Sequence, residues 1–515
     1  MMRQSTFTLL LASAAVLTAV AAQAGRDRPN IIVIMVDDMG YSDIGCYGGE
    51  IATPNIDKLA DEGMRFRNFY NNAKCGASRA SLLTGQYPHK GGMRVGATFA
   101  EVLRPVGYRT LMTGKWHQRG IPTDHGFDRY YGLCDGCCNF WNPGIQARPG
   151  EGKPGRKFSD NKTRKWAIED QLITDGYTPE DKNFYTTDAF TQYAVDRLEE
   201  YKDEDKPFVL YLAYTAPHYP IQAWPEDIAK YKDTYKIGWD QLRENRFQRM
   251  KKMGVIDDQS RLSPRAEQVK PWSSLSKEER RDEAYMMAVY AAMVDRMDQG
   301  VGKVMAKLKE IGKDENTIVI FLSDNGACAE PPNTTPGIPP GPVESYRAVG
   351  PAWANASNTP FRLFKATNHE GGILAPMIVR WPGVTKPGSF SDHVGHLIDF
   401  VPTFMELTGA KYPAEIRGQE LLETDGISFL PVLKGQKPVE HPFLCWKYSN
   451  AKAVRAGDWK LVEMRMKSKS KPATSPWELY NLADDPTELN DLSAQYPEKV
   501  RTMAKLWDNW IAKKN

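Results

Sequence analysis

Short, continuous apolar runs recur along most of this chain, and each of them predicts a buried β-strand. The candidates are residues 31–36, 107–112, 208–214, 317–322 and 377–379. Strands that are apolar at successive positions belong to sheets that are covered on both faces. Because these runs alternate with helical candidates from Ile31 to about Leu407, the pattern predicts an α/β fold with a large, mostly parallel sheet sandwiched by helices.

Apolar residues at helical spacing predict two long helices. Residues 282–302 carry a stripe that includes Met286, Met293 and Met297, and we interpret these methionines as core. The charged segment 231–283 predicts a helical insertion at the rim of the sheet. Residues 497–512 form a second, amphipathic helical pattern. The length of 515 residues suits a large α/β domain with a smaller appendage.

Polar side chains follow two of the predicted strands directly. Asp37 and Asp38 come after the first strand, and Asp324 and Asn325 come after residues 317–322. Ligands of open α/β sheets bind outside the carboxyl ends of the strands, and neighbouring carboxylates repel one another unless a cation neutralises them. Carboxylate and amide oxygens are the ligands of calcium or magnesium. Such residues also commonly cap loops, but two pairs in the same context favour a metal site.

The segment from Cys75 to Gly85 predicts a short helix with a cysteine and Arg79 at its start. A helix N-terminus offers unpaired N–H groups and a positive dipole, which suit an anionic substrate. Arginine adds a planar fork of donors that matches tetrahedral oxyanions. A buried free cysteine beside an arginine is the alternative interpretation of this segment taken alone.

Further basic residues follow other predicted strands. Lys115 and His117 come after residues 107–112, and His218 comes after residues 208–214. Lys365 and His369 precede the strand at 377–379. A lone histidine in a loop is usually structural, and a lone lysine is usually solvated, so these residues gain weight from the two metal-ligand pairs and from Cys75.

Taken together, these motifs resemble those of a type I sulfatase of the alkaline phosphatase superfamily, similar to the bacterial arylsulfatases. The resemblance covers nearly the whole chain beyond residue 24. It includes the segments 28–30, 53–60, 75–85, 114–117, 216–218, 323–326, 369–372, 455–460 and 478–482. It implies a catalytic domain over residues 25–440 and a small α+β C-terminal subdomain over residues 441–515.

The resemblance implies an exported hydrolase of sulfate esters, either of sulfated glycans or of aryl sulfates. Cys75 would be oxidised to formylglycine (3-oxoalanine) by a maturation enzyme. A divalent cation, Ca²⁺ rather than Mg²⁺, would be held by Asp37, Asp38, Asp324 and Asn325 and would touch the modified Cys75. The hydrated aldehyde would then attack sulfur.

The same resemblance assigns roles to the basic residues. Arg79 would steady the nucleophile, and Lys115 and Lys365 would bind sulfate oxygens. His218 would protonate the leaving oxygen, and His117 would remove a proton from the hydrated aldehyde. His369 would contact the substrate.

One position departs from the family pattern, because Ala77 stands where proline is commonest. This leaves the maturation route open. Two other functions stay open as well: a phosphate or phosphonate ester hydrolase with the same metal site, and a noncatalytic glycan-binding relative. The sugar, the position of its sulfate, endo or exo action and the oligomeric state are not fixed by these motifs.

Composition agrees with an exported enzyme. Arg3 precedes an apolar stretch at residues 9–17, and Ala22-Gln23-Ala24 predicts cleavage after Ala24, with the mature chain periplasmic or secreted. The stretch is short for a membrane anchor.

Six cysteines besides Cys75 permit disulfides of undetermined connectivity. The net charge of +3, without a basic stripe, disfavours nucleic-acid binding.

Overall fold

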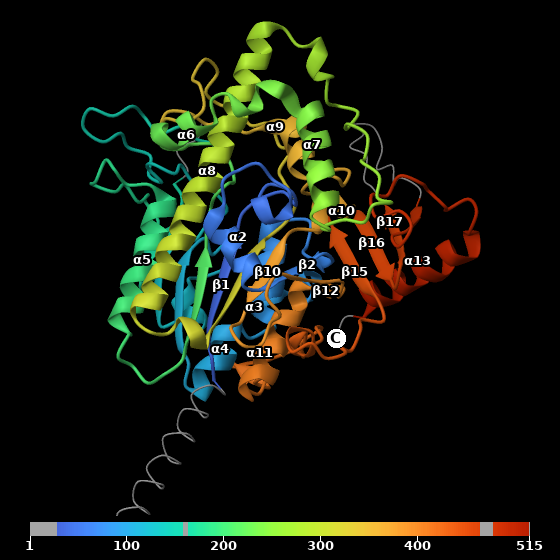
Figure 1. The fold of residues 1–515 in the computed structure, drawn as a ribbon. Coiled ribbons are helices and arrows are strands. Elements are labelled where there is room, and N and C mark those ends of the chain that lie inside the picture. The colour runs from blue at the N-terminus through green and yellow to red at the C-terminus, as the bar shows by residue number, and fades with distance from the viewer. Residues whose placement is uncertain (1–27, 158–162, 464–476, 514–515) are drawn as a thin grey trace, which may run out of the picture.

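The computed structural model describes residues 28–157, 163–463 and 477–513. The predicted export signal at residues 1–24 lies outside these residues. A ten-stranded sheet forms the centre of the molecule (Figure 1). In spatial order its strands are β11 (Ser389–Ser391), β2 (Met64–Phe66), β10 (Met377–Arg380), β9 (Thr317–Ser323), β1 (Asn30–Val36), β8 (Phe208–Ala213), β4 (Arg109–Gly114), β5 (Arg129–Leu133), β6 (Trp166–Ile168) and β7 (Gln171–Ile173).

Parallel strands make up the middle of this sheet. Strands β9, β1, β8, β4 and β5 pair in parallel, whereas β10 is antiparallel to both of its neighbours and β6 and β7 form an antiparallel edge. The predicted α/β fold with a mostly parallel, helix-covered sheet is confirmed, with antiparallel strands toward its flanks. All five apolar runs that the sequence singles out contribute strands to it.

Helices cover both faces of the sheet, which explains why β1 is apolar at every position from Ile31 to Val36. One core cluster contains Ile32 and Ile34 together with residues of α2 (Pro54–Asp61), α5 (Thr186–Glu200) and α8 (Lys277–Glu310). The other contains Ile31 and Val33 with residues of α3 (Cys75–Thr84), α4 (Phe99–Leu103) and α11 (Phe400–Thr408). Alternate side chains of one strand therefore enter two separate cores.

The remaining elements surround this sandwich. They are β3 (Phe69–Tyr70), α6 (Pro225–Tyr231), α7 (Gly238–Lys252), α9 (Gly350–Ser357), α10 (Glu370–Ile373), β12 (Gly395–His396), β13 (Glu415–Ile416), β14 (Gln419–Glu420) and α12 (Leu430–Leu433).

All seven cysteines are buried free thiols. No helix in the described part of the chain has the length and apolarity that a bilayer span requires.

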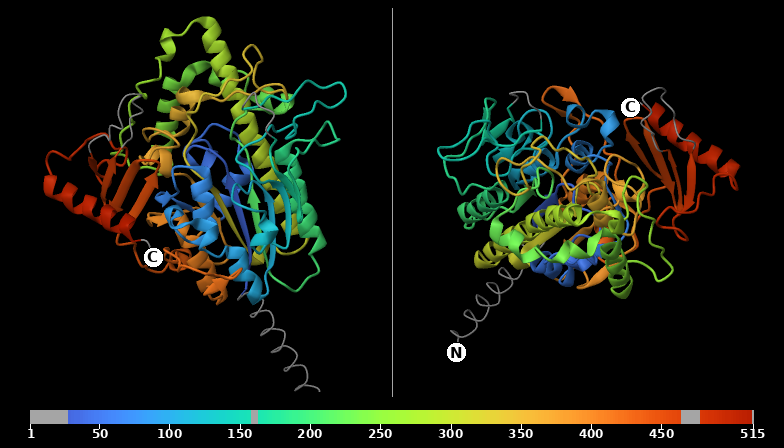
Figure 2. Two further views of the ribbon diagram at one scale, coloured as in Figure 1. Left: turned by 180° about the vertical axis from the view of Figure 1, so that it is seen from behind. Right: turned by 90° about the horizontal axis from the view of Figure 1, so that it is seen from above.

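A second, four-stranded antiparallel sheet follows, made of β15 (Leu444–Tyr448), β16 (Ala451–Ala456), β17 (Trp459–Glu463) and β18 (Glu478–Asn481). Helix α13 (Pro497–Ala512) packs on β16 and β17 through Met503, Trp507 and Trp510, which are buried. Figure 2 shows this unit, in red, at one side of the large sheet.

A buried ion network joins the small sheet to the large domain. Lys460 of β17 is fully buried, and its Nζ lies 2.6 Å from Glu370 Oε1 and 2.8 Å from Glu488 Oε1. Tyr70 donates a 2.7 Å hydrogen bond to Glu370 Oε2. Two carboxylates therefore share one ammonium group at the junction of the two sheets.

We expect Lys460→Met to lower the free energy of unfolding by about 3–5 kcal/mol, because removing one partner of a buried ion pair leaves uncompensated charge behind. Urea denaturation followed by tryptophan fluorescence measures this. Lys58→Met is the matched control: its 3.7 Å pair with Glu62 is largely exposed, and such pairs contribute about 0–1 kcal/mol. Equal effects of the two substitutions would show that the network does not hold the sheets together.

Candidate active site

The two predicted pairs of ligands meet at one edge of the large sheet. Strands β1 and β9 are parallel neighbours with Val36 opposite Ser323, so the residues that follow them emerge side by side. The Asp38 N–H donates to Asp324 Oδ1 at 3.2 Å, and the Asp324 N–H donates to the Val36 carbonyl at 3.1 Å. The two strand ends are thus joined by one hydrogen bond to a side chain and one to the backbone.

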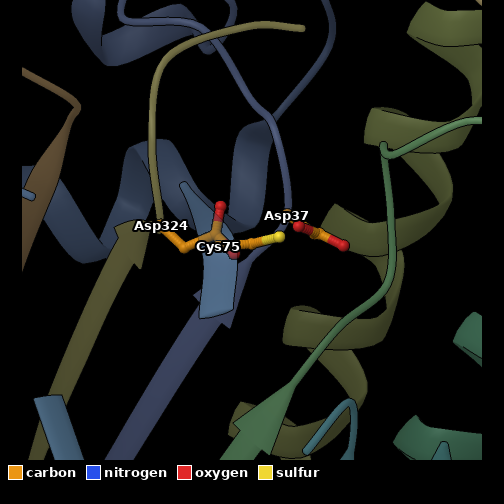
Figure 3. Close-up of side chains that lie close together, drawn as sticks. All are labelled: Asp37, Cys75 and Asp324. Carbon is orange, nitrogen blue, oxygen red and sulfur yellow. The ribbon is translucent and has the colours of Figure 1, made fainter. Parts of the chain in front are cut away.

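Cys75 is the first residue of α3 and points at these carboxylates. One ligand atom from each of Asp37, Cys75 and Asp324 lies within 4.8 Å of the others, and all three residues are buried (Figure 3). Lys74 takes the N-cap position in an extended conformation, and Gly85, at φ 68°, ends the helix. The helix thus presents the cysteine and its first N–H groups to the sheet edge.

Three buried cations face the three carboxylates. Arg79 donates from Nη2 to Asp324 Oδ2 at 3.0 Å, and its other terminal nitrogen donates to the Lys115 carbonyl at 3.0 Å. Lys115 Nζ pairs with Asp37 Oδ2. Lys365 Nζ lies 2.6 and 2.7 Å from the two oxygens of Asp38. Each of the three carboxyl groups therefore lies against a positively charged side chain.

These charges set the protonation of the carboxyl groups. Burial acts to raise the pKa of Asp37, but the charges of Lys115, His218 and Arg79 hold it below its ordinary value. Lys365 lowers the pKa of Asp38 against the same burial. Burial and the negative charge of Asp37 raise the pKa of Asp324 well above its usual range, although Arg79 opposes this. Asp324 therefore favours ionisation when further positive charge is nearby.

The donor set fits a hard divalent cation. Asp37 Oδ1 and Asn325 Oδ1 are both buried, and neither has a hydrogen-bond partner among the described residues. Leaving such an oxygen unsatisfied costs about 1–3 kcal/mol. Asn325 is oriented by its Nδ2, which donates to Asp38 Oδ1 at 2.7 Å. Free oxygens from carboxylate and amide groups, next to a carboxyl group with a raised pKa, are suited to calcium or magnesium.

Glycine is required where the chain carries Lys115 and His117 into the site. Gly114 has φ 103°, and a Cβ there would lie 1.9 Å from the Ala213 carbonyl oxygen. His117 itself has φ 54°, and Asp38 has φ 68°. Non-glycine residues in the left-handed region are uncommon and are concentrated at functional sites. The backbone at this edge is therefore held in a strained conformation by its surroundings.

The His117 ring lies over the first turn of α3, since a Cβ on Gly76 would contact it at 3.7 Å. Burial, together with the charges of Lys115 and Arg79, lowers the pKa of His117 to about 3. A neutral imidazole therefore stands next to Cys75, and its Nδ1 lacks a hydrogen-bond partner within the residues described.

His218 faces the same site from the loop after β8. Its Nδ1 lies 2.6 Å from the Tyr219 carbonyl oxygen, so Nδ1 carries a hydrogen and donates it. Its Nε2 lies 3.4 Å from Asp38 Oδ2. Burial lowers the pKa of His218 to about 4, with Asp38 acting in the opposite direction. Nε2 is thus the nitrogen that can exchange a proton inside the site.

His369 is placed differently from the other predicted residues. It is fully buried, and its Nε2 lies 2.9 Å from Glu478 Oε2 of β18 in the small sheet. This polar contact thus joins His369 to the C-terminal unit rather than to Cys75 or the carboxylates. The predicted role of His369 in substrate binding finds no support in this contact and stays a prediction.

A cluster that the sequence did not single out lies beside the site. Lys74 Nζ pairs with Glu330 Oε1 at 2.7 Å, and Tyr219 donates to Glu330 Oε2 at 2.6 Å. The Tyr219 ring lies against His218, with the ring centroids 4.2 Å apart. Lys74 and Tyr219 adjoin Cys75 and His218 in the chain, which is the one signal that could have identified them.

Comparison with known proteins agrees with this geometry. A family model described as Sulfatase matches residues 29–410, and one described as N-sulphoglucosamine sulphohydrolase, C-terminal, matches residues 361–514. An uncharacterised sulfatase of Schizosaccharomyces pombe is 32% identical over 94% of this chain and 94% of its own length. An arylsulfatase of Klebsiella aerogenes is 32% identical over 80% of this chain and 94% of its own.

A solved structure is similar over nearly the whole chain. The crystal structure of Ps i-CgsB in complex with k-i-k-neocarrahexaose matches with a TM-score of 0.66 and 27% sequence identity. The match covers 95% of this chain and 94% of that chain. The similarity thus extends over both the large sheet and the small one.

Proposed function

The chain belongs to the sulfatase family, whose members hydrolyse sulfate esters, and from this premise we propose that it releases inorganic sulfate from sulfated carbohydrates through a nucleophile derived from Cys75. The observation that supports this proposal is the buried cysteine at a helix N-terminus, within 4.8 Å of Asp37 and Asp324. A carbohydrate is favoured because the similar protein Ps i-CgsB was solved with a carrageenan hexaose.

Two groups complete the chemistry. Formylglycine at Cys75 supplies, when hydrated, a hydroxyl that can attack sulfur. A divalent cation, proposed to be calcium, would when bound offset the charge of the sulfate and acidify that hydroxyl. The residues that would hold the cation are Asp37, Asp38, Asp324, Asn325 and the modified Cys75.

The lysines and the arginine bind and orient the substrate. Lys115 and Lys365 now pair with Asp37 and Asp38, so their ammonium groups already lie at the positions that a bound anion would reach. Both have a raised pKa, because the aspartates outweigh burial, and stay charged. They bind sulfate oxygens, where negative charge accumulates during transfer. Arg79 is held by Asp324 and steadies the nucleophilic oxygen.

The two histidines take part in different proton transfers. His218 exchanges its proton through Nε2 and donates it to the leaving oxygen, since a neutral alcohol leaves more readily than an alkoxide. Because its pKa is lowered, His218 is neutral in the free protein near neutral pH. The bound, negatively charged substrate must therefore stabilise its protonated form. His117 is neutral and accepts a proton next to residue 75. The overall reaction consumes one water and yields an alcohol and inorganic sulfate.

The mature enzyme acts outside the cytoplasm. We base this on the export pattern at residues 1–24 and on the catalytic and C-terminal units proposed for residues 25–440 and 441–515. A formylglycine-generating enzyme is the required maturation partner. Because Ala77 stands where proline is commonest in the family, the type of maturation enzyme is not fixed by the motif. Residues 231–283 form the proposed helical insertion.

Sulfate transfer can be tested against phosphate transfer. We expect the matured, calcium-loaded enzyme to hydrolyse 4-nitrophenyl sulfate with a higher kcat/KM than 4-nitrophenyl phosphate, because the chain belongs to the sulfatase family. Steady-state release of 4-nitrophenol measures both reactions. Faster turnover of the phosphate would assign the chain to the phosphate ester hydrolases instead, and binding without turnover of either ester would favour a noncatalytic role.

A further inference from the structure

A cavity opens beside Lys365. Its volume is about 440 Å³, within the range of small-molecule sites. It is lined by Glu330, Lys365 and Asn368 of the large domain and by Tyr448 and Ala451 of the small sheet. Because Lys365 is proposed to bind the sulfate group, the rest of a bound ester would extend into this space.

Within this cavity, Asn368 has an unused hydrogen-bonding group. The residue is 1% exposed, and neither its Oδ1 nor its Nδ2 has a hydrogen-bond partner within the described residues. By contrast, Glu330 is engaged by Lys74 and Tyr219, and Lys365 by Asp38. A buried amide that leaves both of its polar atoms unpaired is unfavourable, which points to a partner that arrives from outside the chain.

The loop that carries Asn368 is fixed in place. The Lys365 N–H donates to the Ala327 carbonyl at 3.1 Å, and the Ala366 N–H donates to the Ala73 carbonyl at 2.7 Å. Ala366 has φ 72°, a left-handed conformation that is costly for alanine. Strain of this kind persists where the surroundings hold the backbone, so Asn368 is presented to the cavity by a rigid segment.

We propose that Asn368 is a specificity-determining residue that hydrogen-bonds a hydroxyl group next to the sulfate ester, and so selects esters of polyhydroxylated rings. This inference rests on the proposed function. A carboxamide offers one donor group and one acceptor, which matches a hydroxyl that both donates and accepts. A charged substituent would need an oppositely charged side chain as its partner. Glu330 and Lys365, the charged residues named in the cavity, are already paired, so a neutral hydroxyl is favoured.

Two aromatic sulfate esters that differ by one hydroxyl test the proposal. 4-Nitrocatechol sulfate (2-hydroxy-5-nitrophenyl sulfate) carries a hydroxyl next to the ester, and 3-nitrophenyl sulfate, a phenyl ester with its nitro group at the same place relative to the sulfate, does not. We expect Asn368→Leu to lower kcat/KM for the catechol ester by about tenfold to a hundredfold, and for the phenyl ester by less than about twofold. Leucine keeps the volume of the side chain and removes both polar atoms.

The matched control removes an amide elsewhere. Asn68 lines a different cavity, and its Nδ2 donates to the Asp392 carbonyl at 3.2 Å. Asn68→Leu should leave the ratio of the two kcat/KM values unchanged. The melting temperature of Asn368→Leu should equal or exceed that of the wild type, since two unsatisfied polar atoms are lost. An equal fall in kcat/KM for both esters, together with a lower melting temperature, would overturn the proposal in favour of a structural role.

A binding measurement separates this inference from the proposed function. In the Cys75→Ala background, which cannot turn over, titration calorimetry with 4-nitrocatechol sulfate and calcium measures affinity alone. We expect Asn368→Leu to weaken that binding by about tenfold or more. Unchanged binding would overturn the role of Asn368 even if the enzyme proved to be a sulfatase. Failure of the wild type to release sulfate from either ester would instead contradict the proposed function. The binding comparison would then still decide whether Asn368 contacts the hydroxyl.

Discussion

Replacing Cys75 by alanine is expected to abolish turnover of sulfate esters, with a loss in kcat of about 10⁴-fold or more, because the nucleophile of a covalent mechanism has no substitute in the site. The side chain is buried among Asp37, Asp324 and the first turn of α3, so alanine removes one atom and leaves the fold intact. Sulfate release from 4-nitrophenyl sulfate measures the loss, and circular dichroism checks the fold.

Cys445→Ala is the matched control for this experiment. Cys445 is also buried, but it lies in β15 of the small sheet and takes no part in the site. We expect this variant to retain activity. Peptide mass spectrometry of the wild type should find residue 75 oxidised to the aldehyde in active preparations. Full activity of protein in which residue 75 remains a thiol throughout would contradict the formylglycine mechanism.

The central strands could be predicted because their environment is uniform. β1 and β9 are buried on both faces, so their residues 31–36 and 318–322 are all apolar, and these runs can be recognised as strands without knowing which strands lie beside them. The length of α8 could not be predicted from the same kind of pattern. The stripe of methionines marks residues 282–302, whereas the helix extends from Lys277 to Glu310. Its first turn is charged and exposed, so apolar periodicity gives no signal there, whereas at the other end the buried Val304 and Leu308 continue the stripe beyond residue 302.

A local signal did exist at the start of α8. Ser276 accepts a hydrogen bond from the Glu279 N–H, and Glu279 bonds back to the Ser276 N–H, which forms a capping box. This Ser-x-x-Glu motif marks the helix start one residue before Lys277. Helix boundaries therefore depend on capping residues more than on the hydrophobic stripe, and the prediction was too short because it used the stripe alone.

Much of the candidate site could be located from the sequence, since parallel strands bring their carboxyl ends to one edge. Asp37 and Asp324 meet for that reason, although 287 positions separate them. The pairing of Lys365 with Asp38 and of His369 with Glu478 could not be predicted, because it depends on the path of long loops and on where the small sheet docks. Asn368 is distinguished because its amide has no hydrogen-bond partner among the residues that the structure describes, which a sequence does not reveal.

The second large effect concerns the cation. We expect Asp37→Ala to weaken calcium binding by more than about a hundredfold and to lower activity in parallel, because loss of even an outer partner of a metal ligand costs about 10–100-fold. Removal of Asp37 also leaves Lys115 without its counterion in a fully buried position. Titration calorimetry of the calcium-free protein measures the affinity, and chelation of the wild type followed by calcium addition should abolish and then restore turnover.

Asn325→Leu separates the contribution of one ligand atom to calcium affinity from the contribution of the charge of the site. The substitution keeps the net charge of the site and removes Oδ1, the buried oxygen that lacks a partner in the described chain. It should therefore weaken calcium binding while the ion pairs of Lys115 and Lys365 persist. Asp314→Asn is the control: Asp314 precedes the same strand, β9, and pairs with Arg380 at 2.9 Å. Because Asp314 lies before the amino end of β9 and Asn325 follows its carboxyl end, calcium affinity should fall for Asn325→Leu and not for Asp314→Asn. Unchanged affinity in both Asp37→Ala and Asn325→Leu would place the cation elsewhere and remove the electrostatic basis for acidifying the nucleophile.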